Sequence, residues 1–285
     1  MIYKEIAQSI ENMSPPFQPF VNIFTRDYTE IVMRDWNEKS VKKSAVFYQF
    51  KAAQTLNCCN IPIVPDACVN MLIELDPAEP RTFCSGVFLE PKMLNLKPGV
   101  EYFGCKPYSA LGLRMGGCTV SDILDTSLPL TEVFPGMAQL VEHMLCATTR
   151  FEQRVKLMYD FAWDNMIDRQ YVPSFIDYMA AIVCSSNPDC LSVNLERATG
   201  YSDRYCRKRF NKAFGCSPKQ YSSIMRLQNT LKSLQWWHAD SLSALAIQQG
   251  YYDQAHFIHD FKKYMSMTPN SFKKLLDSVL WESTA

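Results

Sequence analysis

Positively charged side chains are concentrated between Arg197 and Lys232. Nine Lys and Arg residues fall in that stretch against a single acid, Asp203. Solvated helix faces normally mix both signs of charge, so this bias favours binding to a polyanion. The net charge of the whole chain does not show this bias, because Lys+Arg and Asp+Glu both number 29. Residues 186–285 carry 13 basic and 8 acidic side chains, a surplus of +5, whereas residues 1–185 carry 16 and 21, which gives −5.

The elements that must position these charges are written twice in the last hundred residues. One copy occupies 200–218 and the other 250–269, and each opens with Gly-Tyr and closes on Pro. From Ser202 onward the copies are offset by a constant 51 residues, so that Ser202 corresponds to Asp253. Each copy has a short helix, a turn that contains Gly, a capped second helix and a Pro stop. This outline is typical of a helix-turn-helix.

In the first copy, Ser202 is placed to cap a helix that begins at Asp203, whose carboxylate suits the positive helix end. Apolar residues then recur at steps of three and four and predict a buried stripe of Cys206, Phe210 and Ala213 or Phe214. The outward face carries Arg204, Arg207, Lys208 and Asn211. Arginine can bond guanine in bidentate fashion, and a good base contact contributes about 1–3 kcal/mol of discrimination. A merely solubilising face is the alternative, which the duplicated context disfavours.

In the second copy, Asp253 is the cap, and the residues expected to point inward are Phe257, Phe261 and Met265. Adding 51 to the first outward face gives Ala255, Ile258, His259 and Lys262, with Gln254 at the helix start. Gln can bond adenine bidentately, and apolar side chains can meet thymine methyl groups. His256 is open to two interpretations, a packed histidine beside the apolar stripe or a base contact.

The candidate contacts to a duplex follow from these two faces. In the first copy they are Ser202, Arg204, Tyr205, Arg207, Lys208 and Asn211, and in the second copy Asp253, Gln254, Ala255, His256, Ile258, His259 and Lys262.

The stretch from Lys219 to Trp237 predicts one helix between the two copies, with Tyr221, Ile224, Leu227, Leu231 and Leu234 on its buried side. At 1.5 Å per residue such a helix is roughly 28 Å long. Helices that read one face of B-DNA on successive turns sit about 34 Å apart, so this helix is a suitable spacer. Candidates for phosphate contacts, which set register without reading sequence, are Lys219, Lys232, Lys273 and Lys274.

The rest of the chain predicts an α+β protein. Strand-length runs over 44–50, 69–75, 82–89 and 112–115 indicate a β sandwich or barrel-like domain over residues 1–119. Apolar residues then recur at helical steps and predict a helical connector over 120–185, which ends near Ser185-Ser-Asn-Pro-Asp189. Residues 186–285 form the all-α part, with helix-turn-helix units expected at 191–216 and 242–266.

At these motifs the chain resembles the AraC/XylS family of bacterial transcription regulators, whose DNA-binding domain has two helix-turn-helix units joined by a central helix. Gly200-Tyr-Ser, Gly215-x-Ser-Pro218 and Gly250-Tyr-Tyr-Asp-Gln-Ala-His-Phe257 carry the resemblance. It extends more weakly to a subgroup with a Val-Pro-Asp-Gly-Cys-like strand start, here Val64-Pro-Asp-Ala-Cys68, and loosely to Phe103-Gly-Cys-Lys-Pro-Tyr108. By this resemblance, the N-terminal domain would sense an effector or mediate dimerisation.

Three positions depart from the family pattern. Glu196 stands four residues before the Gly of the first unit, where a small residue is usual, whereas the second unit keeps Ala246. His259 stands where Arg is common, and Ser266 replaces the usual Gly after the second recognition helix. Histidine titrates near pH ~6.5 unless perturbed, so these departures predict a second unit with lower or pH-dependent affinity.

Aromatic residues and cysteines are concentrated in the N-terminal domain, and the role of each group has alternative interpretations. The aromatic residues Phe47, Tyr48, Phe83, Phe88, Tyr102, Phe103 and Tyr108 are either core or the lining of a cavity, and core is favoured. The cysteines Cys58, Cys59, Cys68, Cys84, Cys105 and Cys118 are either buried and inert, which is favoured, or form a thiol sensor or a soft-metal site. The four histidines lie elsewhere, so no metal site and no cofactor is expected here.

Taken together, these features predict a sequence-specific DNA-binding transcription regulator of the bacterial cytoplasm, associated with the nucleoid. The expected partners are double-stranded DNA, with RNA polymerase, a small-molecule effector in the N-terminal domain and a second copy of the chain as further candidates. No membrane association and no enzymatic activity are expected, because no apolar run approaches bilayer length and no catalytic motif is present. Activator is the expected mode, although repression stays open. The alternative function is a redox-responsive or alkyl-accepting thiol sensor coupled to the same DNA reader. A third alternative is a purely protein-binding module built on the same repeats.

Overall fold

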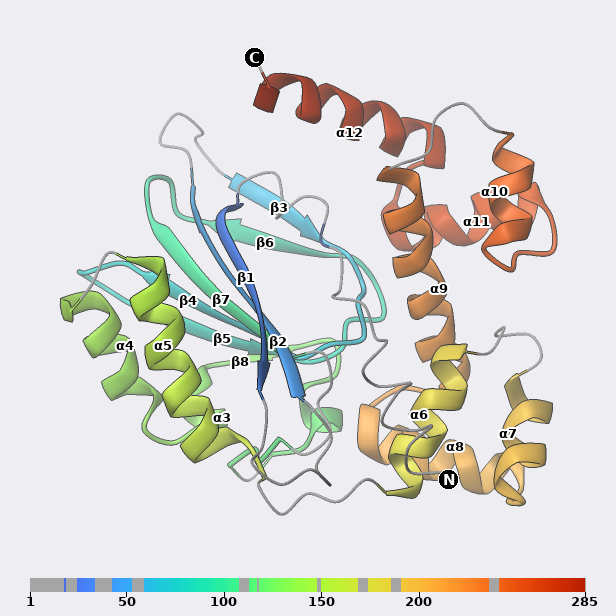
Figure 1. The fold of residues 1–285 in the computed structure, drawn as a ribbon, viewed down its shortest axis with the longest axis horizontal. Helices are drawn as coiled ribbons and strands as arrows, with labels where there is room; N and C mark the ends of the chain where they lie inside the picture. The colour runs from blue at the N-terminus through green and yellow to red at the C-terminus, as the bar shows by residue number, and fades with distance from the viewer. Residues whose placement is uncertain are drawn as a thin grey trace.

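The fold is that of a computed structural model. It describes residues 18, 25–33, 43–52, 59–107, 113–116, 118–147, 150–168, 174–185, 191–235 and 241–284. The predicted α+β class is confirmed: an antiparallel β region is followed by helices that continue to the C-terminal end (Figure 1).

The N-terminal half is built around a six-stranded antiparallel sheet in the order β1-β2-β7-β4-β5-β8. Its strands are β1 (Thr25–Met33), β2 (Lys43–Lys51), β4 (Asn70–Leu75), β5 (Arg81–Ser85), β7 (Glu101–Pro107) and β8 (Ser127–Leu128). A separate two-stranded sheet pairs β3 (Cys59–Ile63) with β6 (Lys92–Leu96). Within β4, Met71 to Leu75 are all buried, because the sheet is covered on both faces rather than on one.

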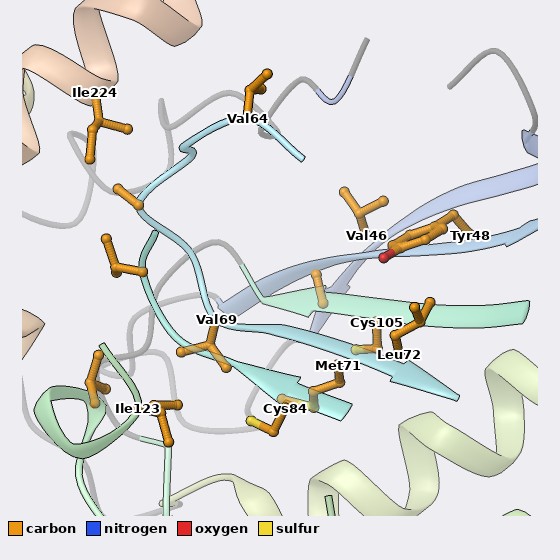
Figure 2. Packing of buried hydrophobic residues seen from close by; sticks show 14 of the residues in the cluster. Val46, Tyr48, Val64, Val69, Met71, Leu72, Cys84, Cys105, Ile123 and Ile224 are labelled. Carbon is orange, nitrogen blue, oxygen red and sulfur yellow. The ribbon is translucent and has the colours of Figure 1, made fainter. Parts of the chain in front are cut away.

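Close contact between β2 and β7 shapes the centre of the sheet. Gly104 is required there, because a Cβ at this position would lie 2.1 Å from Cζ of Tyr48. The Tyr48 hydroxyl passes over the glycine and donates to Oδ1 of Asn70 at 2.9 Å. Figure 2 shows Tyr48, Leu72 and Cys105 among the buried side chains of this layer. The core interpretation is confirmed for Phe47, Tyr48, Tyr102 and Phe103, and Tyr108 lies outside the described residues.

Short helices cover one face and one edge of the sheet (Figure 1). They are η1 (Val120–Ile123), α3 (Leu130–Val133), α4 (Met137–Ala147) and α5 (Phe151–Phe161), which continues into a π-helical turn, Ala162–Met166. Two expectations fail in this region. Ser127 and Leu128, predicted as part of the helical connector, form β8, because the edge of β5 offers unpaired backbone groups. In the run predicted over 112–115, the described residues 113–115 form no strand, and Leu113 makes only an isolated bridge to Ile167.

The remaining helices form the C-terminal half. They are α6 (Phe175–Ser185), α7 (Leu191–Thr199), α8 (Asp203–Phe214), α9 (Pro218–Gln235), α10 (Leu242–Gln248), α11 (Gln254–Met265) and α12 (Pro269–Thr284). α6 packs against α7, α8 and α9, so the last helix before residues 186–190 lies with the C-terminal half. Among the residues that the structure describes, no helix combines the length and apolar character needed to cross a bilayer.

Candidate nucleic-acid interface

The first recognition helix, α8, begins and ends as the sequence predicts. The Oγ of Ser202 accepts from the backbone N–H of Tyr205 at 3.4 Å, and the helix ends at Gly215 in the left-handed region, with φ of 75°. Glu196, the departure from the family pattern, has a structural role, since its carboxylate accepts from the backbone N–H of Asp203 at 2.8 Å. A negative charge at this helix end is favourable. Cys206, Phe210 and Phe214 are buried, as predicted.

The outward face of α8 is open to solvent in the folded chain. Arg204, Lys208 and Asn211 are exposed, and so is Arg207, which makes an i,i+4 ion pair with Asp203 at 2.7 Å. Such exposed pairs are weak, so this one does not hold Arg207 away from a polyanion. Arg209 and Lys212 are also exposed on α8 but are missing from the predicted set. The count of basic residues in the sequence includes both side chains. The helical steps of three and four that define the outward face do not include them.

Tyr205 is only partly accessible for contact with DNA, because its ring packs against other aromatic rings. Its ring is 4.8 Å from the ring of Tyr201 and 6.1 Å from that of Phe175 on α6, while 42% of the residue remains exposed. This aromatic contact connects α8 to α6, so Tyr205 has a packing role in addition to its predicted place at the interface.

The second recognition helix, α11, repeats the construction. The Oδ1 of Asp253 accepts from the backbone N–H of His256 at 2.7 Å, which confirms the predicted cap. Phe257, Phe261 and Met265 are buried. The helix ends at Ser266, whose φ of 56° is the left-handed conformation that Gly215 adopts in the first unit. A non-glycine residue is strained in this conformation, so Ser266 occupies a position suited to glycine.

The outward face of α11 is less charged and more varied in exposure. The exposed candidates are Asp253, Gln254, Ala255, His259 and Lys262, together with Lys263, which the sequence analysis did not select. Ile258 and His256 are partly buried. His256 accepts from the backbone N–H of Tyr252 through Nδ1 at 3.4 Å, and its ring stands edge-on to that of Tyr251 at 5.5 Å. These two contacts support the interpretation of His256 as a packed histidine.

The central helix α9 separates the two units. Its 18 residues give a length of roughly 27 Å at 1.5 Å per residue. All five residues predicted for its buried side are buried, whereas Trp236 and Trp237 lie outside the described residues. Figure 1 shows α8 near the first end of α9 and α11 near the other. Of the candidate phosphate contacts, Lys219 and Lys274 are exposed, Lys232 is half-buried, and Nζ of Lys273 pairs with Asp277 at 2.7 Å.

Comparison with known proteins agrees with this geometry in the C-terminal half. Residues 195–275 match the family model of a helix-turn-helix domain, and the resemblance to the AraC type is confirmed for this part of the chain. Residues 195–275 therefore form a helix-turn-helix domain, as the repeated motif predicts. No curated protein matches the chain.

Similar solved structures include several of ToxT from Vibrio cholerae. An apo form of ToxT with a single substitution is 9% identical, with 87% of this chain and 97% of that chain covered and a TM-score of 0.39. ToxT with a bound unsaturated fatty acid is 13% identical, with 85% and 97% covered and a TM-score of 0.40. ToxT bound to (E)-4-(8-methylnaphthalen-1-yl)but-3-enoic acid is 10% identical, with 88% and 98% covered and a TM-score of 0.41.

Proposed function

We propose that the protein regulates transcription in the cytoplasm by reading two successive major-groove segments of DNA, one with α8 and one with α11. The observation that carries this proposal is the matched exposure of the two helices. Both bury the equivalent stripe, and both leave the opposite face open while the chain is fully folded. The surplus of positive charge in the first unit supplies the attraction to phosphates, and the less charged α11 adds base contacts.

The test is binding to duplexes that carry two half-sites at varied separation, after the preferred sequence has been selected from a random pool. Affinity should be highest when the half-site centres are about 10–10.5 base pairs apart, and should fall when half a helical turn is inserted. A preferred sequence that spans only one groove segment, or affinity that is indifferent to the separation, would contradict two-segment reading.

We further propose that the N-terminal half modulates this DNA reader through direct contacts. Nε2 of Gln228, on α9, donates to the carbonyl of Pro65 at 2.8 Å, and both groups are buried. Figure 2 shows Ile224 of the same helix facing the segment that contains Val64. The first unit also touches η1, because a Cβ placed on Gly215 would lie 3.3 Å from Cα of Ser121. A change in the β region therefore has a physical route to α8 and α9.

The Val64-Pro-Asp-Ala-Cys68 segment that Gln228 contacts is held by a buried polar network. Asp66 pairs with Nζ of Lys106, and Nε2 of Gln18 donates to both Asp66 and the carbonyl of Val64 at 2.7 Å. Burial by itself would lower the pKa of Lys106, but the charge and hydrogen bond of Asp66, together with the neighbouring Tyr48 and Cys68, raise the pKa overall. Ala67 has a φ of 57° where the related motif has Gly. Because this network is satisfied and buried, we infer that the segment moves as one body.

A cavity of about 270 Å³ lies between the two sheets and is the candidate effector site. It is lined by Leu72, Phe83 and Phe88 and carries polar groups from Asn70 and Lys92. An apolar lining with a few convergent polar groups is typical of small-molecule sites. Leu72→Trp, which fills the cavity, should leave DNA affinity in vitro unchanged and abolish the response of a reporter gene in cells. If the reporter gene responds normally to the Leu72→Trp variant, this cavity is not the effector site.

The thiol-sensor alternative has little chemical support among the described cysteines. Burial raises the pKa of the Cys84 and Cys105 thiols to about 12, and it also raises the pKa of Cys68. These thiols therefore stay protonated near neutral pH, whereas the reactive form is the thiolate. Iodoacetamide at pH 7.5 should leave all three unmodified in the native protein and modify them in denaturant, as read by peptide mass spectrometry. Rapid native labelling of any of them would favour the sensor. The side chains of Cys58 and Cys59 lie outside the described residues.

A further inference from the structure

Arg226 is a buried cation on the central helix and is not among the candidate DNA contacts. It lies in the middle of α9 and only 8% of it is exposed. A charge removed from water is costly unless it is paired and hydrogen-bonded. The contacts of Arg226 therefore indicate what its burial achieves.

Those contacts all belong to the second helix-turn-helix unit. Nη2 donates to Oδ2 of Asp260 on α11 at 3.1 Å, and Nη1 donates to the carbonyl of Gly250 in the turn at 3.3 Å. The guanidinium carbon lies 4.1 Å from the centre of the Tyr251 ring, which is itself buried. One planar group thus holds the recognition helix and the preceding turn to α9. Lysine could not reproduce this, because its ammonium lacks the rigid fork.

Among the side chains that the structure describes, the first unit shows no equivalent of this clamp. The position that corresponds to Asp260 by the 51-residue offset is Arg209, which is exposed. The first unit is held by other parts of the chain: Gly215 abuts η1, and the ring of Tyr201 lies 5.1 Å from that of Phe175 on α6. Of the two units, the second is the one that Arg226 ties to α9, beside a hydrogen bond from Nε2 of Gln249 to Oγ of Ser233 at 3.0 Å.

We propose that Arg226 is a positioning residue that sets the separation and rotational phase of α11 relative to α8. By doing so it determines which spacing of DNA half-sites the protein prefers. The inference rests on the proposed two-segment reading. It assigns Arg226 no contact with DNA, because the side chain acts through Asp260 and the turn at 250–251.

The first arm of the test needs no DNA. Hydrogen exchange of the full-length chain is compared for wild type, Arg226→Lys, Asp260→Ala and Asp260→Asn. Arg226→Lys and Asp260→Ala should speed exchange of the α11 amides by about tenfold or more, since breaking a buried pair is costly, and should leave α8 unchanged. Asp260→Asn keeps an acceptor of the same shape and should have a smaller effect. Unchanged α11 exchange in Arg226→Lys, or equal acceleration in α8 and α11, would overturn the proposal.

The second arm measures affinity against half-site separation. Arg226→Lys and Asp260→Ala should flatten the spacing preference about tenfold while leaving binding to the first half-site alone unchanged, and Asp260→Asn should restore most of it. Lys156→Ala, an exposed lysine on α5, is the control. A sharp preference that persists in Arg226→Lys would refute the positioning role. If wild type itself shows no preference, two-segment reading fails, whereas the exchange arm still decides whether Arg226 fixes α11.

Discussion

The two helix-turn-helix units share one construction and differ in what surrounds it. Both recognition helices are capped by an oxygen side chain, bury the equivalent stripe and end in a left-handed residue. The first unit is strongly basic and is anchored to η1 and α6, whereas the second is less charged and is anchored to α9 through Arg226. Packing therefore fixes which residues of the repeat are buried, whereas the surface charge of each unit and its attachment to the rest of the chain differ.

The largest expected effect comes from the shared core. Phe210 and Phe261 are both fully buried, and replacement of either by Ala should cost about 3–5 kcal/mol of unfolding free energy. Because only the first unit contacts η1, Phe210→Ala should also accelerate hydrogen exchange in the N-terminal half, and Phe261→Ala should not. Denaturant titration with exchange mapping measures both. Equal disturbance of the N-terminal half by the two variants would show that the units are not anchored differently.

Next in size is the loss of base discrimination. Arg204→Ala should lower discrimination at one base position of the first half-site by about 1–3 kcal/mol. Ala255 stands at the equivalent place on α11, and Ala255→Ser should change the second half-site much less, because no long side chain is lost. Binding titrations with single base-pair substitutions measure the difference. If Arg204→Ala weakens all sequences alike, Arg204 contacts phosphate rather than a base.

Exchanging Ser and Gly between the C-terminal ends of α8 and α11 tests whether the left-handed backbone at these two positions favours glycine. Ser266→Gly should stabilise the second unit by about 0.5–1 kcal/mol, since relief of strain outweighs the entropy of glycine in the unfolded chain. Gly215→Ser should destabilise the first by about 1–2 kcal/mol, because the new Cβ is strained and meets η1. Melting temperatures of the two variants report both changes. Opposite signs are required, and a stabilising Gly215→Ser would contradict the equivalence of the two ends.

The smallest effect concerns long-range charge. Lys208 and His259 occupy equivalent exposed positions on the two helices. His259→Lys at pH 8 should steepen the salt dependence of binding by about 0.9 log unit per log unit of salt if one more phosphate is neutralised, so that doubling the salt costs about twofold more affinity. Lys208→Ala should reduce the slope by a similar amount. An unchanged slope in both variants would place these positions away from the backbone of the duplex.

Prediction from sequence succeeded where the signal is local. The caps at Ser202 and Asp253 and the buried side of α9 follow from residue type and helical period, and the structure confirms them. It failed where partners are distant, as at Ser127–Leu128, whose strand exists only because β5 lies beside it. The proposed DNA contacts stay predictions, although the structure leaves most of them exposed.

The repeated helical register follows from the amino-acid sequence alone, because capping groups and apolar steps act within a few residues of one another. How each copy is held follows instead from contacts between distant parts of the chain. Gln228 meets a carbonyl 163 residues earlier in the chain, and Arg226 meets Asp260 34 residues later. Neither pairing produces a periodic pattern in the sequence, because such contacts depend on where whole helices pack and not on the spacing of neighbouring side chains.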